Sequence, residues 1–137
     1  MSRPITILAD ATIWAAALGG RLGRGQPVFH ALRRERRVTA PGLVFAALLA
    51  ELDDPARAET VRVWAAEAPP LPEPPTAWIA AGDLGARLRR AGVGLDSPGN
   101  YLVALAIREA LPLWSLDPIF DAVARALPIE RFEVPPG

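Results

Sequence analysis

The sequence feature that most constrains the fold is a short apolar run, residues 5–9, that ends abruptly at Asp10. Branched side chains dominate this run, which is typical of a strand buried on both faces. Residues 14–18 then have helix-forming composition and stop at a Gly pair. Asp10 therefore lies where a buried parallel strand leads into a helix, the place where open α/β sheets bind ligands. Asp is also a common helix N-cap, so both roles are open for Asp10.

The same pattern of strand and helix continues along the chain. Short strands are expected at residues 38–40 and 113–116, with a possible edge strand at residues 129–134. Helices are expected at residues 27–37, 42–52, 55–68, 76–91, 101–110 and 118–127. The proline-rich residues 69–75 are expected to form a stiff loop within one domain that spans residues 1–137. Alternating strands and helices predict an α/β fold with a mostly parallel sheet covered on both faces.

Composition excludes several kinds of site. The chain has no Cys and a single His, His30, which removes disulfides, thiol chemistry, Cys-ligated zinc and any multi-His metal site. A metal bound here would be a hard cation held by oxygen ligands. Fifteen basic and fifteen acidic residues balance, so the net charge gives no general attraction to nucleic acid. No apolar run is long enough to span a membrane and no signal peptide is visible, so a cytoplasmic protein is expected.

A second carboxylate, Asp117, also follows an apolar strand. Because the C-terminal ends of parallel strands share one edge of a sheet, Asp10 and Asp117 are predicted to face the same region. Two close carboxylates repel each other, and a cation between them commonly stabilises such a pair. The Asp117–Pro118 pair is also a good helix start, so a purely structural role stays open.

The stretch from Leu8 to Trp14, a strand followed by Asp and then Thr12, resembles the opening motif of PIN domains. The apolar helix around residues 102–106 and the Asp-x-x-Phe motif at 117–120 resemble the C-terminal half of that family. Length and layout are similar to those of VapC-type toxins. The resemblance implies a three-layer α/β/α sandwich and an acidic site that binds Mg²⁺ or Mn²⁺ and hydrolyses RNA. It also implies an antitoxin partner and often a homodimer, with Thr12 supporting the acidic cluster.

The chain departs from the family pattern at two acidic positions. Ala47 stands where the family has Glu, and Asn100 stands where it has a third acid. Glu51, one turn further along the helix, and Asp96, four residues upstream of Asn100, are the candidate replacements. The predicted catalytic residues are Asp10, Asp117, Asn100 and Thr12, and the predicted metal ligands are Asp10, Asp117, Asn100, Glu51 and Asp96. The resemblance thus implies either a ribonuclease with weakened activity or an inactive PIN-like domain kept for binding protein or RNA.

Other features carry weaker predictions. The Arg residues within 33–37 and 87–90 are either phosphate contacts or solvated helix ends. His30 is expected at or near the surface, without a catalytic role. The four Trp residues are assigned to core or interface packing and not to base stacking. A phosphate-receiving α/β domain of the response type is disfavoured because the chain has no Lys.

Overall fold

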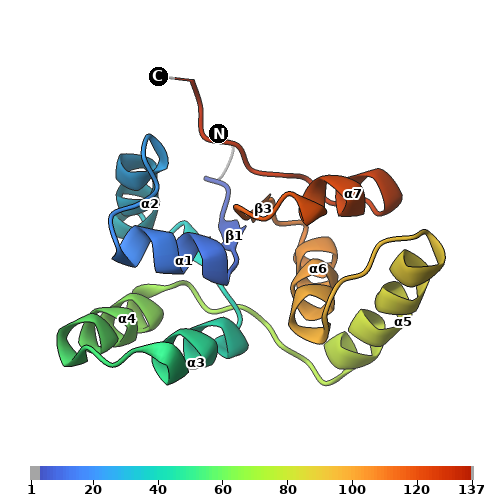
Figure 1. Ribbon diagram of the computed structural model, residues 1–137, viewed down its shortest axis with the longest axis horizontal. Coiled ribbons are helices and arrows are strands. Elements are labelled where there is room, and N and C mark those ends of the chain that lie inside the picture. Colours follow the sequence, from blue (N-terminus) through green and yellow to red (C-terminus); the bar gives the residue numbers. More distant parts are fainter. Residues whose placement is uncertain (1–3, 137) are drawn as a thin grey trace.

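The computed structural model describes residues 4–136. Residues 1–3, on which the predicted lack of a signal peptide partly rests, and residue 137 lie outside that range. No helix within the described range is long and apolar enough to cross a membrane. Figure 1 shows the elements in chain order: β1 (Ile7–Ala9), α1 (Ala11–Leu18), α2 (Gly25–Arg34), β2 (Val38–Thr39), α3 (Gly42–Glu51), α4 (Pro55–Glu67), α5 (Thr76–Arg90), α6 (Ser97–Glu109), β3 (Leu113–Trp114) and α7 (Ile119–Ala126).

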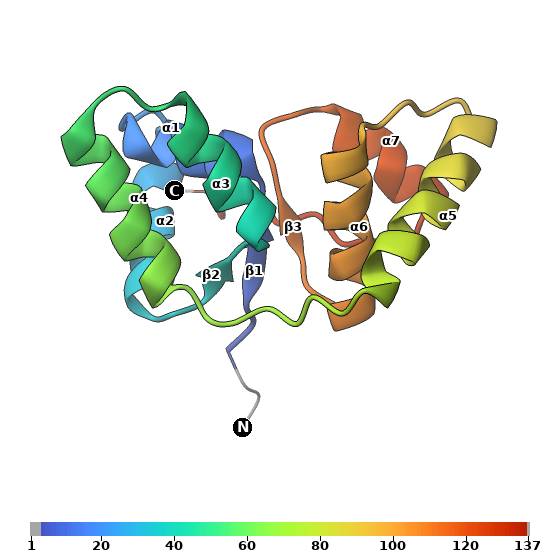
Figure 2. The ribbon, with the colours of Figure 1, turned by 90° about the horizontal axis from the view of Figure 1, so that it is seen from below.

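The three strands form one parallel sheet in the order β2-β1-β3. Leu8 pairs with Thr39 on one side and with Leu113 on the other, so β1 is the central strand. Helices α1 to α4 gather on one side of the molecule and α5 to α7 on the other, with the strands between them (Figures 1 and 2). This arrangement confirms the predicted α/β class with a central parallel sheet.

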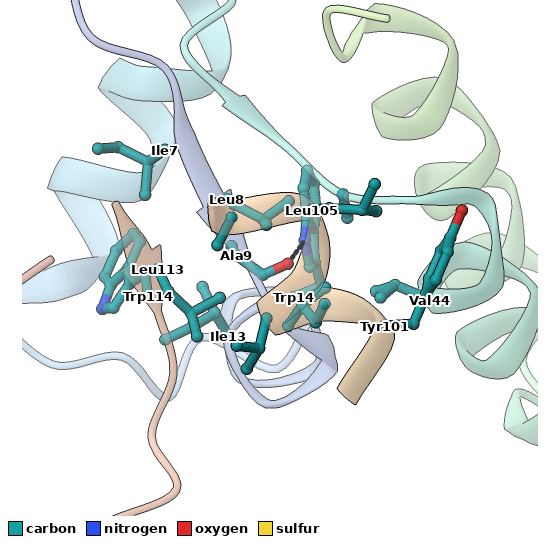
Figure 3. Close-up of a cluster of buried hydrophobic side chains, with 14 of the residues drawn as sticks. Ile7, Leu8, Ala9, Ile13, Trp14, Val44, Tyr101, Leu105, Leu113 and Trp114 are labelled. Carbon is teal, nitrogen blue, oxygen red and sulfur yellow. Dashed lines mark hydrogen bonds between the residues drawn. The ribbon is translucent and has the colours of Figure 1, made fainter. Parts of the chain in front are cut away.

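The core is centred on β1, whose three residues are all buried. Trp14 from α1 packs beneath the sheet and donates a hydrogen bond from its indole nitrogen to the carbonyl of Ala9, at 3.0 Å (Figure 3). This bond satisfies the one polar atom of a side chain that is only 1% exposed. Leu105 of α6 and Leu113 of β3 join the same cluster, so both groups of helices share one core.

Some predicted boundaries of helices and strands differ from those in the structure. Helix α6 begins at Ser97, not at residue 101, because Asp96 caps it and Pro98 fits its first turn. Helix α7 begins at Ile119, one residue later than expected. The expected strand at residues 129–134 is reduced to an isolated parallel bridge between Leu113 and Arg131. Two backbone hydrogen bonds make this bridge, from Leu113 N–H to the carbonyl of Glu130 and from Phe132 N–H to the carbonyl of Leu113, both at 2.8 Å.

The first turn of α5 also differs from expectation. Pro75, not Thr76, occupies the N-cap position. Trp78, which was assigned to core or interface packing, is 52% exposed, and the neighbouring Ile79 is 69% exposed. The proline-rich segment before α5 has no regular structure, as predicted, and runs from the α4 side of the molecule to the α5 side (Figure 2).

Candidate functional site

A cleft of about 690 Å³ opens beside the C-terminal ends of β1 and β3. One wall is apolar and comes from α3, α5, α6, α7 and the segment between α5 and α6, with the side chains of Leu43, Val44, Ala47, Trp78, Leu95, Leu102, Ile119 and Phe120. Three carboxylates line the same cleft: Asp10, Asp96 and Asp117. None of the described residues that line it is basic. We call this feature the acidic cleft.

Asp10 is the most constrained of the three carboxylates. It is the N-cap of α1 and accepts hydrogen bonds from the backbone N–H groups of Thr12, at 3.0 Å, and Ile13, at 3.3 Å. The hydroxyls of Thr12 and Ser115 also donate to it, one to each carboxylate oxygen. Its side chain is nearly buried, at 8% exposed, and each of its oxygens has a partner. The helix-cap role considered from the sequence is therefore confirmed.

Ser115 was missed in the sequence, although the strand register contains the signal for it. Ala9 pairs with Trp114 in the parallel ladder, so the next residues, Asp10 and Ser115, are neighbours at the strand ends. Ser115 Oγ donates to Asp10 and accepts from the N–H of Asp117, at 3.0 Å. Thr12 Oγ1 accepts from the N–H of Leu116, at 2.9 Å. These bonds fix the chain after β3 against the start of α1 and thereby place Asp117 on the cleft.

Asp96 and Asp117 are both exposed, and each is held by a local backbone contact. Asp96 Oδ1 accepts from the N–H of Gly99, at 2.8 Å, as the N-cap of α6. Asp117 Oδ1 accepts from the N–H of Ile119, at 3.0 Å. Such contacts orient the carboxylates without removing them from water.

Ala47 lines the acidic cleft, at the position where the resemblance expects Glu. Glu51 and Asn100 are not among the residues that line it. Glu51 is the exposed last residue of α3. Asn100 lies against α5: its Nδ2 donates to the carbonyl of Leu95, at 3.3 Å, and a Cβ at Gly85 would stand 2.4 Å from that nitrogen. The missing Cβ of Gly85 leaves room for the Asn100 side chain in this position. Asn100 Oδ1 is buried without a hydrogen-bond partner.

The acidic cleft lacks a cluster of three metal-ligating side chains. Within residues 4–136, no group of three Asp, Glu, His or Cys side chains lies close enough to hold a metal ion. Mg²⁺ is commonly held by one or two carboxylates with waters and substrate phosphates, whereas a site built wholly from protein ligands uses several converging charged oxygens. Asp10, Asp96 and Asp117 line one cleft without forming such a cluster, so the residues present do not fit a site of the second kind.

Trp78 and Phe120 are the aromatic residues that line the cleft, and Trp78 is supported from behind by the buried Tyr101. Trp78 stacks on Tyr101, with ring centroids 3.9 Å apart and an angle of 11° between the planes. Tyr101 is buried, and its hydroxyl donates to Glu73 Oε1, at 2.8 Å. Glu73 Oε2 accepts from the N–H of Gly42, at 3.2 Å, so one carboxylate joins α3 to α6. Burial and the hydrogen bond to Glu73 raise the pKa of Tyr101 to about 12, so the hydroxyl remains a donor at neutral pH.

A second hollow, of about 430 Å³, is lined by Arg33, Arg34, Arg36 and Glu67. Arg33 pairs with Glu67, at 2.6 Å, and its guanidinium lies 5.7 Å from the ring centre of Trp64. The contacts with Glu67 and Trp64 hold Arg33 in place, and phosphate contact by these Arg residues stays a prediction.

His30 lies beside this hollow. Burial, with the nearby charges of Arg33 and Arg34, lowers the pKa of His30.

A PIN-like fold is the class that this sheet order and helix arrangement define, and solved structures match it. A chain of VapBC2 from Rickettsia felis, in a crystal structure bound to a DNA fragment from their promoter, superposes with a TM-score of 0.74. Its sequence is 11% identical, and the match covers 93% of this chain and 98% of that chain. A chain of FitAcB from Neisseria gonorrhoeae gives a TM-score of 0.66 at 17% identity, over 93% of this chain and 97% of that chain. No family model and no curated protein matches the sequence. The comparisons therefore confirm the predicted fold.

Proposed function

We propose that this chain is a PIN-like protein of the VapC toxin type whose acidic cleft binds a cationic segment of a protein partner and does not cleave RNA. The observation that carries the proposal is the composition of the cleft. Three carboxylates and an apolar wall line it, and none of the described lining residues is basic. An amphipathic segment with Lys or Arg complements both the charge and the apolar surface of such a groove.

Electrostatics favour a cationic ligand over RNA. A polynucleotide carries a negative charge at every phosphate, and proteins that bind one present Lys or Arg to it. An exposed carboxylate and a cation that pairs with it attract each other by about 0.2–1 kcal/mol, and a phosphate in the same place is repelled. An acidic cleft accepts RNA only where bound cations reverse its charge, and the described residues contain no group of three metal-ligating side chains that would hold such a cation without help from the substrate.

The comparisons support the kind of partner. The neighbours VapBC2 and FitAcB share this fold over 93% of the chain, and the first bears the name of the VapC-type toxins that the sequence resembles. VapC-type toxins pair with an antitoxin protein. A partner of the antitoxin kind is therefore the natural source of the cationic segment. The homodimer implied by the resemblance stays a prediction.

The proposal is tested by measuring the affinity of the full chain for an amphipathic peptide of Leu and Arg, and for the same peptide with Glu in place of Arg. We expect binding of the Arg peptide alone, and weaker binding as salt is raised. Asp96→Asn and Asp117→Asn should each weaken it by about fivefold, close to 1 kcal/mol. Asp53→Asn is the matched control, because Asp53 is exposed but does not line the cleft. Equal affinity in all three variants overturns the proposal.

The second candidate is a ribonuclease that uses Mg²⁺ or Mn²⁺. It is favoured by one observation, that Asp10, Asp96 and Asp117 all line a single cleft at the strand ends. The test is RNA cleavage with either ion, beside Asp117→Asn and an EDTA control. Under our proposal, the parent chain and Asp117→Asn leave the RNA equally intact. If the parent cleaves and Asp117→Asn does not, the ribonuclease is the correct reading.

A gain-of-function variant separates the two candidates further. Ala47 is exposed and lines the cleft, so Ala47→Glu adds the missing family carboxylate without displacing core atoms. We expect Mn²⁺ affinity, measured by calorimetry, to rise in Ala47→Glu above an undetectable parent value. Ala46→Glu, also exposed but outside the cleft, is the control and should bind no Mn²⁺. Strong Mn²⁺ binding by the parent chain contradicts the proposal directly.

A further inference from the structure

We infer that the open face of Trp78 is a cation-binding surface of the acidic cleft, which receives a guanidinium or ammonium group of the bound segment. The inference rests on the proposed function and adds to it the residue that selects the ligand. A cation within about 6 Å of an indole ring centre is attracted by the negative face of the ring, and Trp gives the strongest such contact.

Trp78 differs from the other Trp side chains in exposure. Trp14, Trp64 and Trp114 are buried, whereas Trp78 is 52% exposed although it lines a cleft. A large aromatic side chain left in contact with water costs hydrophobic free energy that burial would recover. An exposed apolar surface of this kind commonly marks a binding site.

The Trp78 ring is held in place from behind. One face of the indole stacks on Tyr101, whose hydroxyl is fixed by Glu73, and Glu73 in turn accepts from the N–H of Gly42. The Trp78 side chain is still 52% exposed and lines the cleft, so part of the ring is left for a ligand. Because the ring is already ordered, a ligand that binds there loses little side-chain entropy from the protein.

The charge around the cleft decides between the ligands that could use this face. A nucleobase can also stack on an exposed indole, but its phosphates would meet Asp10, Asp96 and Asp117 in the same cleft. A guanidinium group gains from both the ring face and the carboxylates. A cationic side chain of a protein is therefore the ligand that the whole surface fits.

The test follows the indole N–H resonances of the Trp residues during titration with the Arg and Leu peptide. A second peptide carries citrulline, which has the shape of Arg without its charge. We expect the Arg peptide to shift the Trp78 resonance and the citrulline peptide to leave it in place. Trp14 is the internal reference, because its indole N–H is buried and bonded to Ala9.

Affinity provides the second readout. Trp78→Leu should weaken binding of the Arg peptide by about fivefold, and Trp78→Phe should lose less because it keeps an aromatic face. Ile79→Ala is the matched control: Ile79 is the next residue, is 69% exposed and does not line the cleft. Its affinity should equal that of the parent.

The outcomes separate this inference from the proposed function. If Trp78→Leu binds like the parent while Asp96→Asn weakens binding, the inference fails and the proposed function stands. If the citrulline peptide shifts Trp78 as much as the Arg peptide does, the contact is apolar and the inference fails. If single-stranded RNA shifts Trp78 and neither peptide does, the ring is a base-stacking surface and both fail.

Discussion

The protein contains two groups of aromatic side chains that differ in burial and in the angle between their rings. In the first, Trp14 meets Phe29, Phe45 and Trp64 with ring centres 5.0–6.2 Å apart, inside the core. These rings meet at steep or tilted angles, which is the usual packing of core aromatics. In the second, Trp78 lies nearly parallel to Tyr101 at the edge of the acidic cleft.

The difference teaches how one residue type serves stability in one place and recognition in another. Trp14 has its indole nitrogen satisfied by Ala9 and its ring surrounded on all sides, so nothing of it remains for a ligand. Trp78 stacks on Tyr101 and remains half exposed in the cleft lining. The buried group stabilises the fold, and under our proposal Trp78 contributes to what the cleft binds.

The largest effect on stability is expected from a pair of substitutions that tests this comparison, Trp14→Ala and Trp78→Ala. Emptying the space of a core Trp should lower the free energy of unfolding by about 3–5 kcal/mol. Removing Trp78 should cost only about 1 kcal/mol, the value of a stacked aromatic pair at an exposed site. Urea denaturation of both variants measures the difference. Losses of equal size would show that Trp78 belongs to the core and would end the distinction.

A smaller effect tests the polar side of the same contrast, with two helix caps. Asp10 caps α1 beside the core and also accepts from Thr12 and Ser115, whereas Asp54 caps α4 at an exposed position. Asp10→Ala leaves buried donors without a partner and should cost about 2–3 kcal/mol, against about 1 kcal/mol for Asp54→Ala. Thermal unfolding of the two variants gives the comparison. A milder effect for Asp10→Ala would mean that water replaces its contacts and that the strand end is open.

The buried half of this contrast could be read from the sequence, because periodicity and burial go together there. The apolar run before Asp10 was predicted to be a buried strand and the apolar run after Asn100 a helix, and the structure contains both. Asp10 and Asp117 were predicted to face one region because parallel strands share their C-terminal edge, and both line the same cleft.

The exposed half could not be predicted, because its contacts depend on tertiary packing. Trp78 is apolar but lies one position off the buried stripe of α5, and this leaves it half exposed. That stripe consists of Ala77, Ala81, Leu84 and Leu88. Asn100 carries an amide oxygen that could bind a metal ion, but its side chain lies against Gly85 and does not line the cleft. Glu73 lies in a proline-rich segment that has no periodicity, so nothing local indicated its bonds to Gly42 and Tyr101.

The smallest effect concerns the support behind Trp78 and uses the fact that Tyr101 is the single Tyr in the chain. Phenolate absorbance therefore reports on this residue alone, and we expect it to rise near pH 12 instead of near the ordinary value of 10.0. Since folding raises this pKa, the neutral hydroxyl stabilises the fold fully below pH 10 and loses that effect as pH rises through about 12.

Glu73→Gln sharpens the measurement. Burial is the larger cause of the shift and persists in the variant, so the pKa of Tyr101 should fall toward its ordinary value but stay above it. Glu59→Gln, an exposed acid of α4 distant in sequence from this contact, should leave the titration unchanged. If Glu73→Gln also leaves it unchanged, the carboxylate does not hold the ring, and the ordering of Trp78 must come from helix packing alone.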